Sequence, residues 1–184
     1  MLNAKVIFSI ITDFSGDIMA SRFKIFTRRK QLKKRWKTAK GQKLIQQLKN
    51  GELTSKSSAD QHTDFRRAVI PNIDLHHTVL ENFDFGQANL KNANFEEAEM
   101  YGIRLSGANL QKANFTGAKL EHANFNGADL TEACFRDADL SKADLRYASV
   151  KKANFDKATL EQCSVLTTDV KHGDFKRPKV FHPI

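Results

Sequence analysis

The chain has 184 residues, 40% of them apolar, and a formal charge of +9 at pH 7, so it is long enough to bury one real core. This composition argues against disorder as the main state, and no apolar run approaches the roughly 20 residues that a membrane-spanning helix needs. Asp13 and Asp17 follow the first apolar residues too closely for a secretory signal peptide. We therefore expect a soluble, cytoplasmic protein whose Cys134 and Cys163 are free thiols in reducing surroundings.

The first part of the chain, residues 1–51, is a basic arm. Residues 18–51 contain twelve Lys or Arg and no Asp or Glu, whereas residues 52–184 contain seventeen basic and nineteen acidic side chains. Apolar residues at 7, 11, 14 and 18 have the spacing of an amphipathic helix, which translation from Met19 would remove. The segment Lys43–Lys49 predicts a further helix that stops at Asn50 and Gly51.

The basic arm has two expected roles. Leu44, Ile45 and Leu48 are expected to cover the open end of the domain that follows. Twelve cations without an anion exceed what solubility requires, so we also expect contact with an anionic surface. A membrane leaflet is favoured because apolar residues precede the basic run, which would make the protein peripheral at the inner membrane surface; nucleic acid is the alternative. The expected contact residues are Arg22, Lys24, Arg28, Arg29, Lys30, Lys33, Lys34, Arg35 and Lys37.

After a linker, residues 52–62, a five-residue period runs through residues 63–177. Every fifth residue from Phe65 to Phe175 is apolar, and alanine usually stands two residues before it. This period fits neither an amphipathic helix, at about 3.6, nor an alternating strand, at about 2. If each pentapeptide forms one side of a coil, the apolar residue and the alanine both point inward.

The spacing of phenylalanine indicates how many sides a coil has. Five pairs of phenylalanines at the apolar position are separated by 20 residues and none by 15. The sequence therefore predicts an all-β solenoid, a four-sided parallel β-helix with coils about 4.8 Å apart. One interior column is expected to contain Phe95, Phe115, Phe135, Phe155 and Phe175.

The motif Ala-Asn/Asp-Leu/Phe-x-x, as in Ala88–Leu90, Ala113–Phe115 and Ala128–Leu130, resembles the pentapeptide repeat family. The resemblance covers about 115 residues and implies a right-handed four-sided β-helix. The best-known activity of this family is DNA mimicry toward a type II topoisomerase such as gyrase. Binding of that kind is an alternative function, although a net charge of −2 over residues 52–184 is small for a DNA mimic.

A filled interior leaves no pocket, so we expect no enzyme, no catalytic residue, no cofactor and no small-molecule substrate. The histidines are scattered, and no metal site is expected. The expected function is a scaffold for protein–protein interaction, with Tyr101 and Tyr147 as exposed anchors. Residues 178–184 are expected to cap the far end, where end-to-end stacking into a homodimer is an alternative.

Overall fold

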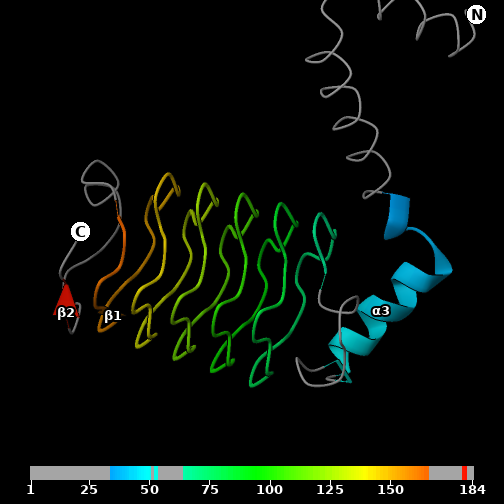
Figure 1. The fold of residues 1–184 in the computed structure, drawn as a ribbon, viewed down its shortest axis with the longest axis horizontal. Helices are drawn as coiled ribbons and strands as arrows, with labels where there is room; N and C mark the ends of the chain where they lie inside the picture. Colours follow the sequence, from blue (N-terminus) through cyan, green and yellow to red (C-terminus); the bar gives the residue numbers. More distant parts are fainter. Residues whose placement is uncertain (1–33, 51, 54–63, 166–179, 182–184) are drawn as a thin grey trace, which may run out of the picture.

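The computed structural model describes residues 34–50, 52–53, 64–165 and 180–181. Its named elements are the helix α3 (Ala39–Lys49) and the short strands β1 (Thr159–Leu160) and β2 (Val180–Phe181). Between them the chain winds into a stack of coils, with α3 at one end and β2 at the other (Figure 1). The helix predicted over residues 7–18 lies outside the described residues, and so do residues 54–62 of the linker predicted over residues 52–62.

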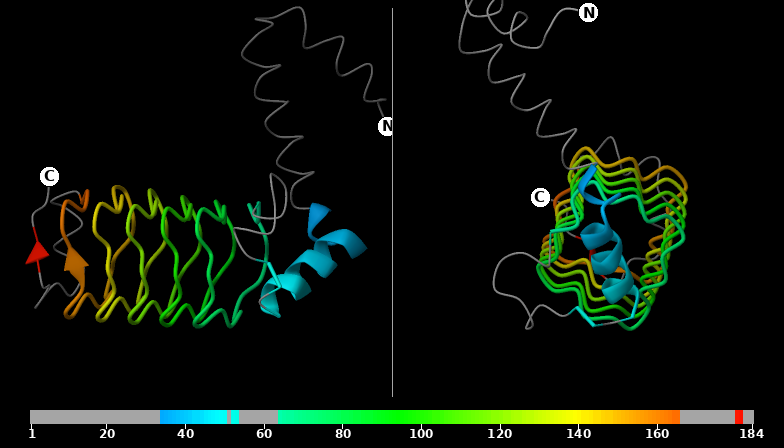
Figure 2. Two further views of the ribbon diagram at one scale, coloured as in Figure 1. Left: turned by 60° about the horizontal axis from the view of Figure 1, so that its bottom comes forward. Right: turned by 90° about the vertical axis from the view of Figure 1, so that its right-hand side faces the viewer.

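The coils are joined by parallel pairing with a constant register. Each bridge joins a residue to the one 20 positions later, from Asp64 with Asp84 to Asp144 with Ser164. A turn follows every fifth residue, so each coil contains four turns. The 20-residue spacing inferred from phenylalanine is thus the register of the solenoid (Figure 2).

Backbone hydrogen bonds run between coils all along the stack, although few residues belong to named strands. Around Phe95, for example, the N–H of Asn94 donates to Ile73 of the preceding coil at 2.9 Å. The N–H of Phe95 donates to Asn114 of the next coil at 2.7 Å, and that of Glu97 to Thr116 at 2.9 Å. Each pentapeptide is therefore tied to both neighbouring coils.

The turns require a left-handed residue at a fixed position. The alanine N–H donates back to the carbonyl of the preceding apolar residue, as from Ala98 to Phe95 at 3.1 Å. The residue before the alanine has a positive φ, for example 52° at Glu97 and 66° at Gly117. A positive φ at the third turn residue alone defines a type II turn. Sixteen of these residues are not glycine, so the coil holds them in a conformation that costs roughly 1–2 kcal/mol each.

Asparagine and aspartate precede the apolar residue because their side chains fold back onto the turn. At twelve turns the side-chain Oδ1 accepts the N–H two residues later, as from Glu96 to Asn94 at 3.2 Å. These are Asx turns. The same side chains also bond between coils, since Asn114 Nδ2 donates to Asn94 Oδ1 at 3.1 Å.

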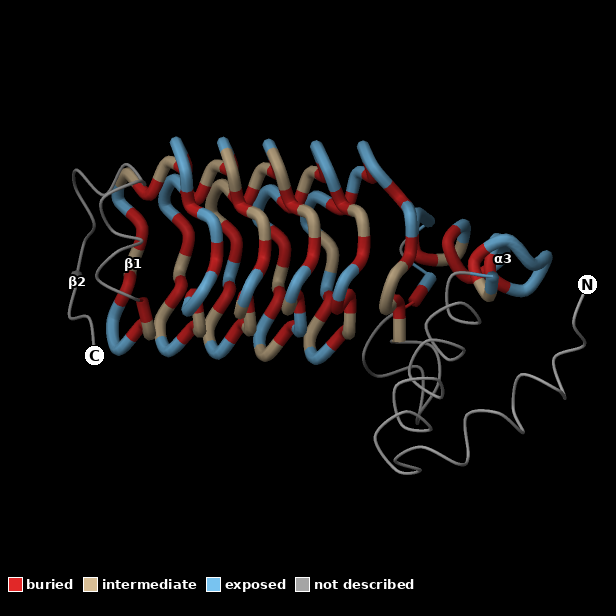
Figure 3. The backbone as a smooth tube through the Cα atoms, turned by 90° about the horizontal axis from the view of Figure 1, so that it is seen from above, coloured by how far each residue is buried: buried red, intermediate tan, exposed pale blue. Residues whose placement is uncertain are grey.

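The buried residues of the described part of the chain are all apolar. Figure 3 shows how buried positions recur along every coil. Phe95, Phe115, Phe135 and Phe155 are fully buried and form one stack, with successive ring centroids 5.0, 4.8 and 4.9 Å apart. The fifth expected member, Phe175, lies outside the described residues. Stacked rings at the coil spacing leave no gap between layers.

The two ends of the stack are closed differently. At the N-terminal end α3 lies across the opening and buries Leu44, Ile45 and Leu48 (Figure 2). The helix begins at Ala39, four residues before the predicted start, and Thr38 caps it by accepting the N–H of Gly41 at 3.1 Å. At the C-terminal end Thr159 pairs with Val180, one residue beyond the regular register, so the segment expected as a cap contributes a parallel strand.

Candidate functional site: a cationic cap on a charged coil

Trp36 closes the N-terminal end of the coil. Its side chain is 3% exposed, and its ring stacks on Phe65 with centroids 5.1 Å apart. Its Nε1 donates to the carbonyl oxygen of Arg66 at 2.9 Å. Phe65 in turn contacts Phe83 and Phe85, so the N-terminal segment of residues 34–50, which we call the cap, continues the aromatic packing of the first two coils. The sequence favoured Leu44, Ile45 and Leu48 as the residues that cover this end, and Trp36, a lone tryptophan among cations, is buried with them.

An ion network attaches the cap to the outside of the coil. Arg35 Nη1 lies 3.1 Å from Asp64 Oδ2, and Arg66 Nη2 lies 2.9 Å from the same oxygen. Asp84 extends the network, with Arg66 Nε at 3.8 Å and Arg104 Nε at 3.3 Å from its Oδ2. Burial opposes ionisation of Asp64, but hydrogen bonds from Arg66 and the charges of Arg66 and Arg35 outweigh it and lower its pKa to about 2.

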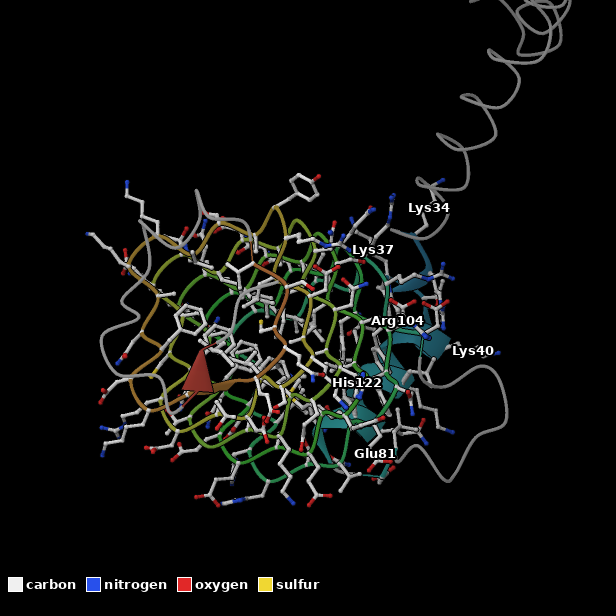
Figure 4. The ribbon with its side chains drawn as sticks, turned by 60° about the vertical axis from the view of Figure 1, so that its left-hand side comes forward. Lys34, Lys37, Lys40, Glu81, Arg104 and His122 are labelled. Atoms are coloured by element: carbon white, nitrogen blue, oxygen red, sulfur yellow. The ribbon has the colours of Figure 1, made fainter. Side chains whose placement is uncertain are left out.

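The outer surface of the cap is cationic. Residues 34–50 contain six Lys or Arg and no Asp or Glu. Five of these cations are exposed lysines, namely Lys34, Lys37, Lys40, Lys43 and Lys49. Lys34, Lys37 and Lys40 are seen at the α3 end of the molecule in Figure 4.

The predicted anionic-surface residues are only partly described. Lys34 and Lys37 are exposed, while the guanidinium of Arg35 pairs with Asp64 and stacks over the Trp36 ring at 4.7 Å. The side chain of Arg35 therefore holds the cap against the coil, and we no longer expect it to contact an external surface. The other predicted contacts lie outside the described residues: Arg22, Lys24, Arg28, Arg29, Lys30 and Lys33.

The 20-residue register sorts the surface of the coil into four faces, which we name by their characteristic residues. The Arg face contains the pentapeptides centred on Phe65, Phe85, Leu105, Phe125 and Leu145, and the Lys face those centred on Ile70, Leu90, Leu110, Leu130 and Val150. The Phe face contains the pentapeptides centred on Leu75, Phe95, Phe115, Phe135 and Phe155. The Glu face contains those centred on Leu80, Met100, Leu120, Leu140 and Leu160.

Charge differs between these faces. The Arg face has four basic and three acidic side chains, and the Lys face has four basic and two acidic. The Phe face and the Glu face each have five acidic and two basic side chains. The coil is therefore acidic on two neighbouring faces and basic on the other two.

The two tyrosines predicted as anchors lie on different faces. Tyr101 is 49% exposed on the Glu face, with its ring edge-on to His122 at 5.2 Å between centroids. Tyr147 is 71% exposed at a corner of the Arg face. They do not form a single patch, so each face has to be considered separately.

Other kinds of site find little support in the described part of the chain. No group of three or more His, Cys, Asp or Glu side chains there is placed to hold a metal ion. None of the helices described is long and apolar enough to cross a membrane. The burial of the Cys163 thiol raises its pKa to about 12, which makes it unreactive.

Comparison with known families identifies the repeat. The model of the family described as pentapeptide repeats (8 copies) matches residues 72–107, 98–137, 108–146 and 123–162. These matches lie within the described coils. The chain belongs to the pentapeptide repeat family.

Several solved structures are similar. HetL, a pentapeptide repeat protein involved in heterocyst differentiation regulation from the cyanobacterium Nostoc sp. strain PCC 7120, is 25% identical; the match covers 55% of this chain and 53% of HetL, with a TM-score of 0.48. The chain thus spans about half the length of HetL. The pentapeptide repeat protein alr5209 from Nostoc PCC 7120 is 25% identical over 70% of this chain and 88% of its own, with a TM-score of 0.46.

A third similar structure is QnrB1, a plasmid-mediated fluoroquinolone resistance protein. It is 20% identical over 65% of this chain and 68% of its own, with a TM-score of 0.42. No curated protein matches the chain. At this level of similarity the comparisons identify the family, and the function has to be inferred from the surface residues.

Proposed function

We propose that this is a non-catalytic binding protein: a right-handed four-sided β-helix presents its sides to a protein partner, while the cationic cap attaches the molecule to an anionic surface. The observation that carries the proposal is the separation of charge. Residues 34–50 have six cations and no anion, whereas residues 64–165 have twelve basic and fifteen acidic side chains. The 20-residue register and the four turns in each coil support the four-sided geometry.

The position of the cap supports end-on attachment. Because α3 lies across the end of the coil, its exposed lysines can approach a surface while all four faces stay free (Figure 1). Each Lys or Arg near an anionic leaflet contributes about 1 kcal/mol, so the five exposed lysines alone would bind weakly. Residues 18–33 contain six further cations that would add to this attraction.

A membrane leaflet is the favoured surface. Residues 6–11 are mostly apolar and precede the basic run. A leaflet accepts an apolar segment together with cations, whereas nucleic acid offers chiefly phosphate charge.

Vesicle binding tests the proposal. Lys34, Lys37, Lys40 and Lys43 would be changed to Gln together, which leaves Trp36 and the buried side of α3 intact. This cap variant should lose most co-sedimentation with phosphatidylserine vesicles while binding to phosphatidylcholine vesicles stays at background. A gel shift with duplex DNA runs in parallel, and binding to DNA but not to vesicles would move the proposal to nucleic acid.

The matched control removes the same number of charges from the coil. It changes to Gln the four lysines of the Lys face, which are Lys91, Lys112, Lys151 and Lys152. This control should keep wild-type vesicle binding. Equal losses in both variants would show a general charge effect and would reject the cap as the site.

Binding to a type II topoisomerase by DNA mimicry is a second candidate. The observation in its favour is that acidic side chains outnumber basic ones on the Phe face and on the Glu face. Against it, Lys119 and Lys142 interrupt the acidic surface of the Glu face. Inhibition of gyrase supercoiling by the full chain would support this function, and undisturbed supercoiling at micromolar protein would remove it.

A further inference from the structure

We infer that the Glu face binds the cationic cap of a second copy of this chain. The inference rests on the proposed function, because it names the protein partner of one side of the coil. Both surfaces belong to the same molecule and are opposite in charge, with five acidic and two basic side chains on the face against six cations and no anion on the cap. The cap would then bind two ligands, the anionic surface and the Glu face of a second copy.

The Glu face has more carboxylates without an ion pair than the Phe face does. On the Phe face Asp74, Glu97 and Asp137 each have a histidine or arginine within ion-pair distance. On the described Glu face one carboxylate has such a pair, since Lys119 Nζ lies 2.8 Å from Glu99 Oε1. The Glu face is therefore the acidic surface that can gain most from an external cation.

Tyr101 gives the Glu face a specific anchor. Glu81, Tyr101 and Glu121 occupy the same corner of three successive coils, because the N–H of Asn82 donates to Tyr101 and that of Gly102 to Glu121, both at 2.9 Å. The coil spacing of about 4.8 Å places one carboxylate residue on each side of the tyrosine. A lysine of the second copy can contact the ring and a carboxylate together, which favours a cation over any other side chain.

His122 contributes to this anchor. Its ring lies edge-on to the Tyr101 ring, with centroids 5.2 Å apart and planes at 61°. The histidine supports the tyrosine from the next coil, so little side-chain freedom is lost on binding.

The cap is suited to this contact because it is held firmly at one end. Trp36 and Leu48 are buried beneath it, and Lys40 and Lys43 project from its exposed surface. Each copy offers a cap and a Glu face, so contacts either close into a two-fold pair or continue into a longer assembly. Exposed ion pairs are individually weak because water screens them, so the association should be weak and sensitive to salt.

Sharing the cap makes self-association and surface binding compete. A polyanion that occupies the lysines of the cap should release the second copy. Heparin is a suitable probe of this competition, because it supplies dense negative charge without a bilayer.

Charge exchange followed by sedimentation equilibrium tests the inference. One variant carries Glu81→Lys and Glu121→Lys, and the other carries Lys40→Glu and Lys43→Glu. The wild type should self-associate at low salt and dissociate in heparin, and each variant alone should be monomeric. An equimolar mixture of the two variants should associate again, because each cap then faces an oppositely charged partner. Tyr101→Ala in the wild type should weaken association about tenfold, or roughly 1.4 kcal/mol.

The control is Glu96→Lys with Glu97→Lys, which makes the same charge change on the Phe face and should keep wild-type association. Glu81→Gln with Glu121→Gln replaces the lysine variant if circular dichroism shows a folding defect. A monomeric wild type at low salt, a mixture that stays monomeric, or an equal effect in the control would each overturn the inference. If the proposed function holds, the Glu81→Lys, Glu121→Lys variant should still bind vesicles, whatever its self-association. Failure of the self-association inference can therefore be distinguished from failure of the proposed surface binding.

Discussion

Single side chains outside the core decide whether each turn of this coil can form. A left-handed residue at every corner is unfavourable, yet only four of the described left-handed corners use glycine. The Asx hydrogen bond and the bond from the corner N–H to the next coil, as from Glu97 to Thr116 at 2.9 Å, offset that cost. The sequence therefore tolerates Lys, His or Glu at a corner as long as coils stack on both sides.

Asp64 should make the stability of the cap depend on pH. Its pKa is about 2 in the folded chain against a usual value of 3.8, so the ionised form stabilises the fold. The contribution, about 2 kcal/mol, is fully present above about pH 4 and is lost as the pH falls toward 2. Urea unfolding followed by Trp36 fluorescence should show a smaller loss of stability over this range in Asp64→Asn than in the wild type.

Asp144→Asn is the control for this experiment. Asp144 has the same local pairing, with Arg146 Nη2 at 2.9 Å from its Oδ2, and a lowered pKa, but it lies far from the cap. It should leave the emission of Trp36 in the folded protein unchanged, whereas Asp64→Asn should shift that emission to the red. Identical pH dependence in the wild type and Asp64→Asn would contradict the account.

Gly41 should be intolerant of alanine although it lies within α3. Alanine is favoured over glycine by about 1 kcal/mol in a helix. A Cβ at Gly41 would lie 2.3 Å from the carbonyl oxygen of Arg35 and 2.9 Å from Trp36 Cα. We expect Gly41→Ala to destabilise the cap by about 1–3 kcal/mol in urea unfolding, whereas the exposed Lys43→Ala stays near neutral. A more stable Gly41→Ala protein would show that the cap does not pack in this way.

At the scale of elements, the phenylalanine stack joins successive coils into one unit. Phe115 lies between Phe95 and Phe135 at 5.0 and 4.8 Å, and Phe125 packs edge-on at 5.7 Å. A single coil is too small to bury its residues alone, so these contacts supply cooperativity along the stack.

Shortening one member of the stack tests that cooperativity. Phe115→Ala should cost about 3–5 kcal/mol and Phe115→Leu less, because leucine refills part of the cavity. Tyr147→Ala, at a side chain 71% exposed, should change the free energy of unfolding by less than about 0.5 kcal/mol. Urea unfolding followed by circular dichroism measures all three. A loss at Phe115 no larger than at Tyr147 would mean that the rings do not hold the coils together.

Much of this architecture could be predicted from periodicity, because the pattern repeats many times. Phenylalanines 20 residues apart indicated the register, and alanine marked the second inward position. The closure of the end was harder to predict. Trp36 reaches Phe65 and Arg35 reaches Asp64 across 29 residues, and such single long-range contacts leave no periodic signal. Gly41 also disguised the helix start, because glycine is unfavourable in a helix unless, as here, the backbone packs too closely for a Cβ.

At the scale of the whole molecule, charge is divided twice. The end of the coil carries the cationic cap, and the sides divide into two acidic and two basic faces. The faces could be assigned from sequence once the register was set, whereas the cap site could be assigned only in part. In the cap the structure was needed to show that Arg35 pairs with Asp64 of the same chain, whereas the lysines are exposed.

The salt dependence of vesicle binding is the sharpest test of the cationic cap as the anionic-surface site. The dissociation constant of the full chain for phosphatidylserine vesicles would be measured between about 50 and 200 mM salt, where the Debye length becomes short. We expect binding to weaken steeply with salt in the wild type and in the Lys-face variant. The variant with Lys34, Lys37, Lys40 and Lys43 changed to Gln should show a clearly shallower dependence. The same steep dependence in all three proteins would contradict the assignment of the cap as the anionic-surface site.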